Sequence, residues 1–258
     1  MITFTIATCV RNAEQLIDRT IQSVGQQTYN YVQHIIIDGA STDGTLAIVK
    51  KYKEETIADE SLHDVTVVSE PDHGLYDAMN KALRLASGTY IVFLNAGDTL
   101  PSADTLELLA GSVGDGEQLP GVLYGETDIV NEAGEFVRHR RLKAPEVLRS
   151  RSFLQGMVVC HQAFYALTEI ARQTLYDERY RLSADVDWCI RVMKQSEAEH
   201  RVLKNAHMVL VHYLEGGMSI QQHWPSLKER FVIMRRHFGL LPTIERHIWF
   251  VFRQLILK

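Results

Sequence analysis

The chain has 258 residues, of which 46% are hydrophobic and 23% are charged, with 16 glycines and 6 prolines. This composition is typical of a globular protein and excludes collagen-like, low-complexity and intrinsically disordered chains. The formal net charge of −5 argues against nucleic-acid binding, which needs a basic surface, so we expect no nucleic-acid partner.

The three cysteines, Cys9, Cys160 and Cys189, lie far apart in the sequence. They have neither the number expected of a disulfide framework nor the spacing of a zinc site, and a reducing compartment suits them best. The first residues do not read as a signal peptide, and no stretch approaches the roughly 20 apolar residues of a membrane-spanning helix. We therefore expect a cytoplasmic protein, either soluble or peripheral on the inner face of the cell membrane.

The first hundred residues alternate between short segments rich in β-branched residues and longer segments with helical spacing. They predict strands at 3–8, 34–38, 65–69 and 90–94 and helices at 13–27, 45–53 and 76–86. Such alternation indicates βαβ units, and hence an α/β fold with a parallel sheet flanked by helices. Ligands bind these sheets at the carboxyl ends of the strands.

The second half has a mixed pattern, without repeats or linkers. It predicts a hairpin from 122–124 and 136–139, a helix at 184–194, short strands at 202–203 and 208–212, and helices over 224–258 interrupted near Pro242. We expect this half to complete the sheet of the first half.

Polar side chains stand at or just after the ends of all four predicted strands of the first half. The most informative of them are Thr8, Arg11, Asp38, Asp72 and Asp98. One Asp beside a Gly marks an ordinary turn, but four consecutive strand ends with this chemistry indicate a ligand site. The phosphate-binding glycine motifs of P-loop and dinucleotide-binding proteins are absent. A nucleoside diphosphate with a divalent cation fits a carboxylate-rich edge, because the cation separates the carboxylates from the phosphates.

Four segments carry a resemblance to a known family: 8–12 (TCVRN), 38–45 (DGASTDGT), 70–81 (EPDHGLYDAMNK) and 93–98 (FLNAGD). They resemble family 2 glycosyltransferases, inverting enzymes with the GT-A nucleotide-binding fold, and the resemblance resumes at 182–191. It implies a nucleotide-sugar donor, usually a UDP-sugar, with Mn²⁺ or Mg²⁺ as cofactor. It also implies a glycan or lipid-linked acceptor in the synthesis of bacterial surface polysaccharides such as O-antigen.

The resemblance divides the chain and assigns donor contacts. A single catalytic domain would span 1–220, with a nucleotide-sugar-binding half (1–100) and an acceptor-side half (101–220), followed by a helical extension over 221–258. Thr8 and Asp38 match the positions that receive the nucleoside, and Arg11 could approach the nucleotide. The donor-binding set is Thr8, Arg11, Asp38, Asp72, Asn80, Lys81 and Asn95.

The sequence departs from the family at its metal-binding motif. Asn95 and Gly97 stand where carboxylates are common, which leaves Asp98 as the metal ligand. One carboxylate together with a diphosphate can still hold a cation. His212 is a candidate second ligand, and its alternative is an ordinary hydrogen-bonded histidine at a strand end.

An inverting transfer needs a carboxylate that takes the proton of the acceptor hydroxyl. Asp187 has Arg191 at i+4 and is predicted to form a helix ion pair. Asp185 has no such partner and lies in the first turn, where the helix dipole keeps it ionised. The acidic base motif of the family aligns with Asp185, which we assign as the general base. The alternative is an Asp that only stabilises the helix start.

Other assignments stay open. His161 and Gln162 either line the acceptor site or are structural. The segment 224–258 is basic and rich in aromatic residues, which fits either an anionic membrane surface or a helix packed on the catalytic domain. A catalytically inactive nucleotide-sugar-binding or scaffold protein is an alternative favoured by Asn95. A sugar nucleotidyltransferase is disfavoured, because 8–12 is not a basic glycine-rich loop.

Overall fold

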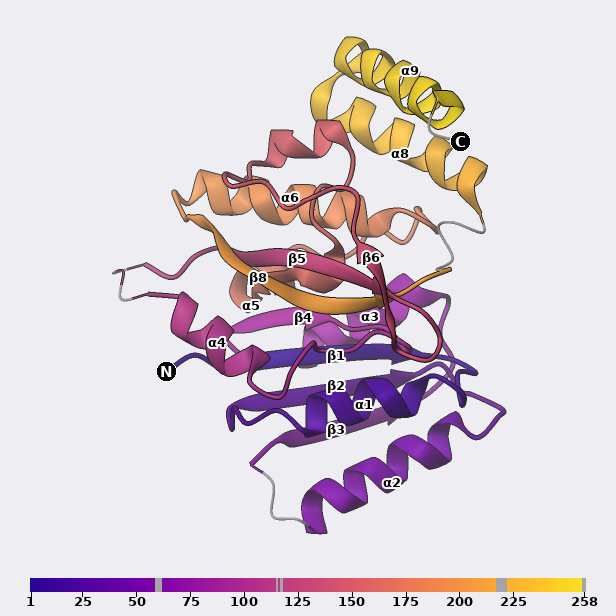
Figure 1. Cartoon of the computed structure of the whole chain (residues 1–258), viewed down its shortest axis with the longest axis vertical. Coiled ribbons are helices and arrows are strands. Elements are labelled where there is room, and N and C mark those ends of the chain that lie inside the picture. Colours follow the sequence, from indigo (N-terminus) through magenta and orange to yellow (C-terminus); the bar gives the residue numbers. More distant parts are fainter. Residues whose placement is uncertain (59–61, 115, 117, 217–221, 257–258) are drawn as a thin grey trace.

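The computed structural model describes residues 1–58, 62–114, 116, 118–216 and 222–256. Its centre is a mixed sheet whose first half consists of four parallel strands in the order β3-β2-β1-β4 (Figure 1). These strands are β1 (Phe4–Val10), β2 (Val32–Asp38), β3 (Asp64–Ser69) and β4 (Tyr90–Phe93). The helices between them are α1 (Ile17–Gly25), α2 (Thr45–Ala58) and α3 (Leu75–Leu85). The predicted βαβ order is therefore confirmed.

Both faces of this half are covered, which explains its continuous apolar strands. Side chains alternate along β2, so that Ile36 packs in a cluster with α1 and α2, whereas Ile35 and Ile37 join the main core with α3. All three isoleucines are fully buried. The parallel register brings the carboxyl ends of β1, β2 and β3 to one edge, where Val10, Asp38 and Ser69 are in line.

The second half extends the sheet with antiparallel pairs and one parallel pair. Strand β7 (Phe164–Leu167) joins β4 to β5 (Val122–Val130), and β5 pairs with β6 (Phe136–His139) as the predicted hairpin. Strand β8 (Leu203–Leu214) pairs with β5 in parallel and is a single long strand. The sequence predicts two short strands here, at 202–203 and 208–212, and the structure has one: Lys204 and Asn205 still pair with β5, and the register shifts where His207 has φ +53°. Two helices and β7 were not predicted: α4 (Thr105–Ser112) and α5 (Thr168–Gln173).

Helix α6 (Ala184–Ala198) crosses the second half and is anchored by an aromatic stack. Trp188 is fully buried under this helix and stacks on Tyr176 with ring centroids 4.9 Å apart. Tyr176 stacks in turn on Tyr76 of α3 at 5.4 Å. The stack connects α3 with the first turns of α6.

The chain ends in two helices, α8 (His223–Phe238) and α9 (Leu240–Ile256), which lie beyond α6 at one end of the molecule (Figure 1). The predicted interruption near Pro242 is confirmed, and the residue at the break is Gly239, with φ +89°. A positive φ ends a helix and favours glycine, whereas a proline in the first turn of the next helix is tolerated. Among the described residues, no helix is long and apolar enough to cross a membrane.

Candidate active site

The loops after β2 and β3 meet at the carboxyl edge of the sheet. Asp38 is fully buried, and its carboxylate accepts hydrogen bonds from the Ser69 hydroxyl (2.7 Å) and the Ser41 amide (3.2 Å). A Cβ atom on Gly39 would lie 2.1 Å from Oδ2 of Asp72 and 3.4 Å from Cδ of Arg11, so only glycine allows this approach. The structure therefore brings Arg11 and Asp72 together beside Asp38 and Gly39.

Three other predicted donor residues bond to protein groups around this edge. Thr8 is fully buried, and its hydroxyl hydrogen bonds with His34 at 3.1 Å. The Asn80 side chain bonds with the backbone N–H and C=O of Tyr176, at 2.7 and 3.1 Å. Lys81 donates to the Pro71 carbonyl and pairs with Glu70, both at 2.9 Å. These contacts hold the loops that surround the site, and direct contact with a donor stays a prediction.

Asp98 lies in the loop after β4 and is 3% exposed. Its two carboxylate oxygens accept hydrogen bonds from the Leu214 amide and the Gln162 side chain, both at 2.9 Å. Burial raises the pKa of Asp98 to about 6, although both hydrogen bonds oppose this shift. Gly97, next to it, has φ +98°, and a Cβ there would lie 2.6 Å from the Leu214 side chain. A carboxylate residue at position 97 would therefore be strained and would need the Leu214 side chain to move.

His212 and Asp98 belong to no larger cluster of candidate metal ligands in the described part of the chain. Within the described ranges, no three His, Cys, Asp or Glu side chains gather to hold a metal ion. Burial is the largest effect on the pKa of His212 and lowers it. The charge of Asp128 raises this pKa, and the charge of Arg19 lowers it. The role of both residues as metal ligands stays a prediction.

One buried oxygen without a hydrogen-bond partner among the described residues is compatible with a cation that the protein would hold together with a diphosphate. Oδ1 of Asn95 is buried and has no hydrogen-bond partner in the described part of the chain. Amide and carboxylate oxygens suit Mg²⁺ and Mn²⁺, which take their remaining ligands from phosphates and water. The residues present fit a cation held jointly with a diphosphate, and not a cation held by the protein alone.

Asp185 stands at the meeting point of the two halves. Its Oδ2 is 3.2 Å from Nδ1 of His161, and its Oδ1 accepts a hydrogen bond from the Tyr76 hydroxyl at 3.3 Å. Burial raises the pKa of Asp185, but the hydrogen bond and charge of His161 and the charge of Arg230 outweigh it, and the net shift is downward. Asp185 is thus ionised at neutral pH.

His161 and Gln162 connect the two halves of the site. Nε2 of His161 lies 3.4 Å from the Asn95 amide nitrogen, while Gln162 bonds to Asp98. Two consecutive residues thus contact both Asp185 and the end of β4. Their sequence position before an apolar strand did not reveal this contact, because it depends on the placement of residues 161–163 between β4 and α6.

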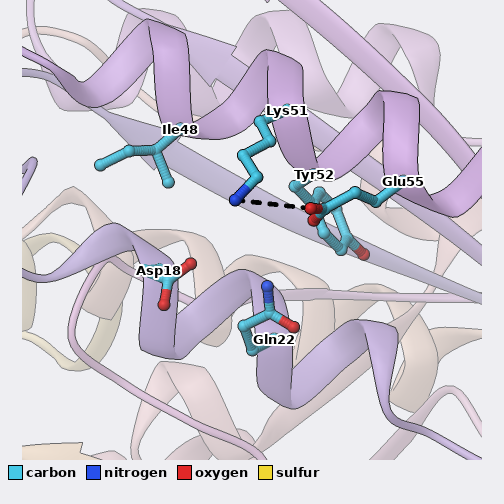
Figure 2. A pocket seen from close by; sticks show the side chains of 6 residues that line it. All are labelled: Asp18, Gln22, Ile48, Lys51, Tyr52 and Glu55. Atoms are coloured by element: carbon cyan, nitrogen blue, oxygen red, sulfur yellow. Dashed lines mark ion pairs between the residues drawn. The ribbon is translucent and has the colours of Figure 1, made fainter.

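A separate pocket lies between α1 and α2, away from these groups (Figure 2). Its lining includes the exposed ion pair of Lys51 and Glu55, with Nζ and Oε1 3.5 Å apart. All of its lining residues come from the two helices and not from the loops after the strands, so we do not assign the donor site to it.

Comparison with known proteins agrees with this geometry. The family model described as "Glycosyl transferase family 2" matches residues 5–171, which is more than half of the chain. The chain belongs to glycosyltransferase family 2. It is therefore a glycosyltransferase, and the resemblance inferred from its strand-end motifs is confirmed. A sugar nucleotidyltransferase is no longer a competing identity.

Relatives of this chain are named as glycosyltransferases, in agreement with the family 2 assignment. The chain is 31% identical over 218 residues to a PGL/p-HBAD biosynthesis glycosyltransferase of Mycobacterium bovis, covering 84% of this chain and 78% of that protein. A putative teichuronic acid biosynthesis glycosyltransferase of Bacillus subtilis, TuaG, is 39% identical over 87 residues, or 34% of this chain and 32% of that protein.

The fold is shared with S. aureus TarS, crystallised with UDP-GlcNAc, at a TM-score of 0.68 and 17% identity, covering 96% of this chain and 73% of that one. A Pyrobaculum calidifontis mannosyltransferase in complex with GDP-Man and Mn²⁺ has a TM-score of 0.59 at 18% identity, covering 98% of this chain and 64% of that one. The predicted GT-A fold is thus confirmed.

Proposed function

We propose that this family 2 glycosyltransferase inverts the sugar configuration and uses a UDP-sugar as donor. The observation that carries the proposal is the position of Asp185, an ionised carboxylate between the donor-side helix α3 and His161 of the acceptor-side half. The UDP-GlcNAc complex of TarS supports a UDP-sugar donor. The names of the relatives, PGL/p-HBAD and teichuronic acid biosynthesis, support a glycan or lipid-linked acceptor in surface polysaccharide or glycolipid synthesis.

The proposed reaction is a single displacement. An acceptor hydroxyl attacks the anomeric carbon on the face opposite the diphosphate, and the bond from that carbon to the diphosphate oxygen breaks. The electron pair leaves with the nucleoside diphosphate, while the hydroxyl proton passes to Asp185. His161 and Tyr76 contact the two oxygens of Asp185 and hold its carboxylate in place.

Mn²⁺ or Mg²⁺ is part of the proposal, with Asp98 and the Asn95 amide oxygen as the protein groups that would contact it. Such a cation, when bound, offsets negative charge on the departing diphosphate.

Thermal unfolding with nucleotides tests the donor site. We expect UDP, and not CDP or GDP, to raise the unfolding midpoint, with a larger rise when Mn²⁺ is present. A ligand at 100 times its dissociation constant adds about 2.7 kcal/mol of stability. For a chain of this size, each kcal/mol raises the midpoint by roughly 2–4 °C. We expect Asp72→Asn, in the loop beside Gly39, to reduce the UDP shift.

Each outcome of this experiment has a clear meaning. A shift with GDP or CDP in place of UDP would move the proposal to another donor. A full shift without Mn²⁺ would remove the cation from the donor site. No shift with any nucleotide would contradict the donor site at the strand ends.

We also propose that the C-terminal helices attach the protein to an anionic membrane surface on the cytoplasmic side. One face of α9 packs inward, with Thr243 fully buried and His247 5.0 Å from the ring of Phe231 on α8. The other face is exposed and mostly apolar, with Glu245 among its apolar residues: Leu241 is 80% exposed and Ile248 65%. The exposed apolar residues of this face, called here the α9 stripe, are Leu241, Ile244, Ile248, Trp249 and Phe252.

The charge of the segment complements an anionic surface. Residues 224–258 hold seven basic and two acidic residues, a net +5, whereas the preceding residues hold 20 basic and 30 acidic ones, a net −10. On α8, the exposed residues Lys228 and Arg235 flank the exposed Val232. An amphipathic helix with apolar and basic residues on its accessible side is typical of binding in the plane of a membrane.

Vesicle co-sedimentation tests the membrane proposal. We expect the protein to sediment with vesicles of phosphatidylcholine and phosphatidylserine, and less so at high salt. Ile248→Asp with Phe252→Asp should weaken binding more than tenfold, because burial of each large apolar side chain contributes about 1.5–3 kcal/mol. Leu108→Asp, an exposed leucine on α4, is the matched control. Equal binding of the double variant, or no binding of the wild type, would contradict the proposal.

A further inference from the structure

Helix α8 contacts the segment that leads into the first turn of α6, directly before Asp185. The Glu229 carboxylate accepts hydrogen bonds from three consecutive backbone N–H groups, those of Arg181 (2.9 Å), Leu182 (2.8 Å) and Ser183 (3.0 Å). Ser183 precedes α6 and makes no side-chain cap of its own helix. A carboxylate from another helix thus holds the entry to the base helix.

Two further contacts from α8 lie on either side of Asp185. The hydroxyls of Ser226 and Ser183 are 3.0 Å apart, and Nε2 of His237 is 2.7 Å from Oδ1 of Asp187. Arg230, next to Glu229, places its positive charge where it lowers the pKa of Asp185. The backbone that bears Asp185 is therefore tied to α8 both before and after this residue.

These contacts lead to an inference that deepens the proposed function and rests on Asp185 as the base. We infer that Glu229 is a positioning residue for Asp185, and that α8 is part of the catalytic unit and not an extension of it. Hydrogen bonds from N–H groups to an ionised carboxylate are among the stronger ones in proteins. The side chain of Asp185 can point at the acceptor hydroxyl only if residues 181–185 keep their path, and small displacements of a reacting group are costly.

Glu229→Gln tests this role, because its amide NH₂ would face backbone N–H groups that need an acceptor. The assay is UDP release from a panel of UDP-sugars, with water and with an alkyl glycoside as acceptors. We expect kcat to fall about tenfold or more, while the donor KM and the UDP-induced thermal shift change less than about twofold. Glu55→Gln, on the exposed face of α2, is the matched control and should behave as wild type.

Amide hydrogen exchange gives a readout that needs no turnover. Exchange over 181–187 should become faster in Glu229→Gln and stay unchanged in Glu55→Gln, and Glu229→Asp should recover part of the wild-type behaviour. If Glu229→Gln does not fold, Ser226→Ala, which removes the hydroxyl that contacts Ser183, replaces it and should show the same split between kcat and KM.

Two results would overturn the inference: a folded Glu229→Gln protein with unchanged kcat and exchange, or an equal loss of kcat and donor affinity. If Asp185→Asn keeps its turnover, the proposed function fails instead, whatever Glu229 does.

Discussion

Asp185→Asn should abolish sugar transfer and leave the donor site intact. The amide is nearly the same size as the carboxylate and can still accept the Tyr76 hydrogen bond, but it cannot take a proton from the acceptor. General base catalysis contributes about 10²–10⁴-fold, so UDP release in the presence of acceptor should fall by at least about 10²-fold. The measurement is UDP release from the UDP-sugar panel, together with the UDP-induced shift of the unfolding midpoint.

A matched control separates this effect from a general loss of negative charge. Asp18→Asn, on the exposed side of α1, should retain wild-type turnover and stability. Near-normal turnover of Asp185→Asn would exclude Asp185 as the base and would direct attention to its neighbour His161. Loss of the UDP shift in the same variant would mean that Asp185 also supports the donor site. A wild-type protein that binds UDP but releases none from any donor would favour the inactive alternative.

The first half of the fold could be predicted because its signals are local. Each strand is a short apolar run, each helix has its own spacing, and parallel strands bring their polar ends to one edge without further information. The ion pair of Asp187 with Arg191, 2.6 Å between Oδ2 and Nε, follows from i+4 spacing and is confirmed. The interruption of the C-terminal helices was predicted from Pro242, but the residue that makes it is Gly239, which permits the positive φ.

The contacts that complete the site could not be predicted, because they join segments far apart in the chain. Asp185 meets His161 from 24 residues earlier, and Glu229 reaches Ser183 across 46 residues. The residues next to His161 and Glu229 in the sequence do not indicate these contacts. Strand β8 was misjudged for a similar reason: Lys204 and Asn205 interrupt its apolar pattern, yet both pair in register with β5. The family resemblance aligned Asp185 with its role but was silent on what holds it.

Asp187→Asn should affect stability where Asp185→Asn affects catalysis, although the two residues lie two positions apart on α6. Asp187 is fully buried, and its two oxygens accept from Arg191 at 2.6 Å and His237 at 2.7 Å. Removing one partner of a buried ion pair costs about 3–5 kcal/mol, and we expect the lower end because Arg191 is partly exposed to water. At roughly 2–4 °C per kcal/mol, the unfolding midpoint should fall by about 6–12 °C.

The pH dependence distinguishes this ion pair from a packing effect. Burial raises the pKa of Asp187. The hydrogen bonds from His237 and Arg191 and the charge of Arg191 together outweigh burial, so the folded-state pKa lies below 3.8. A carboxylate with a lowered pKa stabilises the fold above its unfolded-state pKa, and this contribution is lost as the pH falls through the folded-state value. The difference in stability between wild type and Asp187→Asn should therefore be constant near neutral pH and shrink below about pH 4. Denaturant unfolding at a series of pH values measures it. A stability difference that persists at low pH would assign the effect to packing. An unfolding midpoint equal to that of wild type would show that the Asp187 charge does not stabilise the fold through His237 and Arg191.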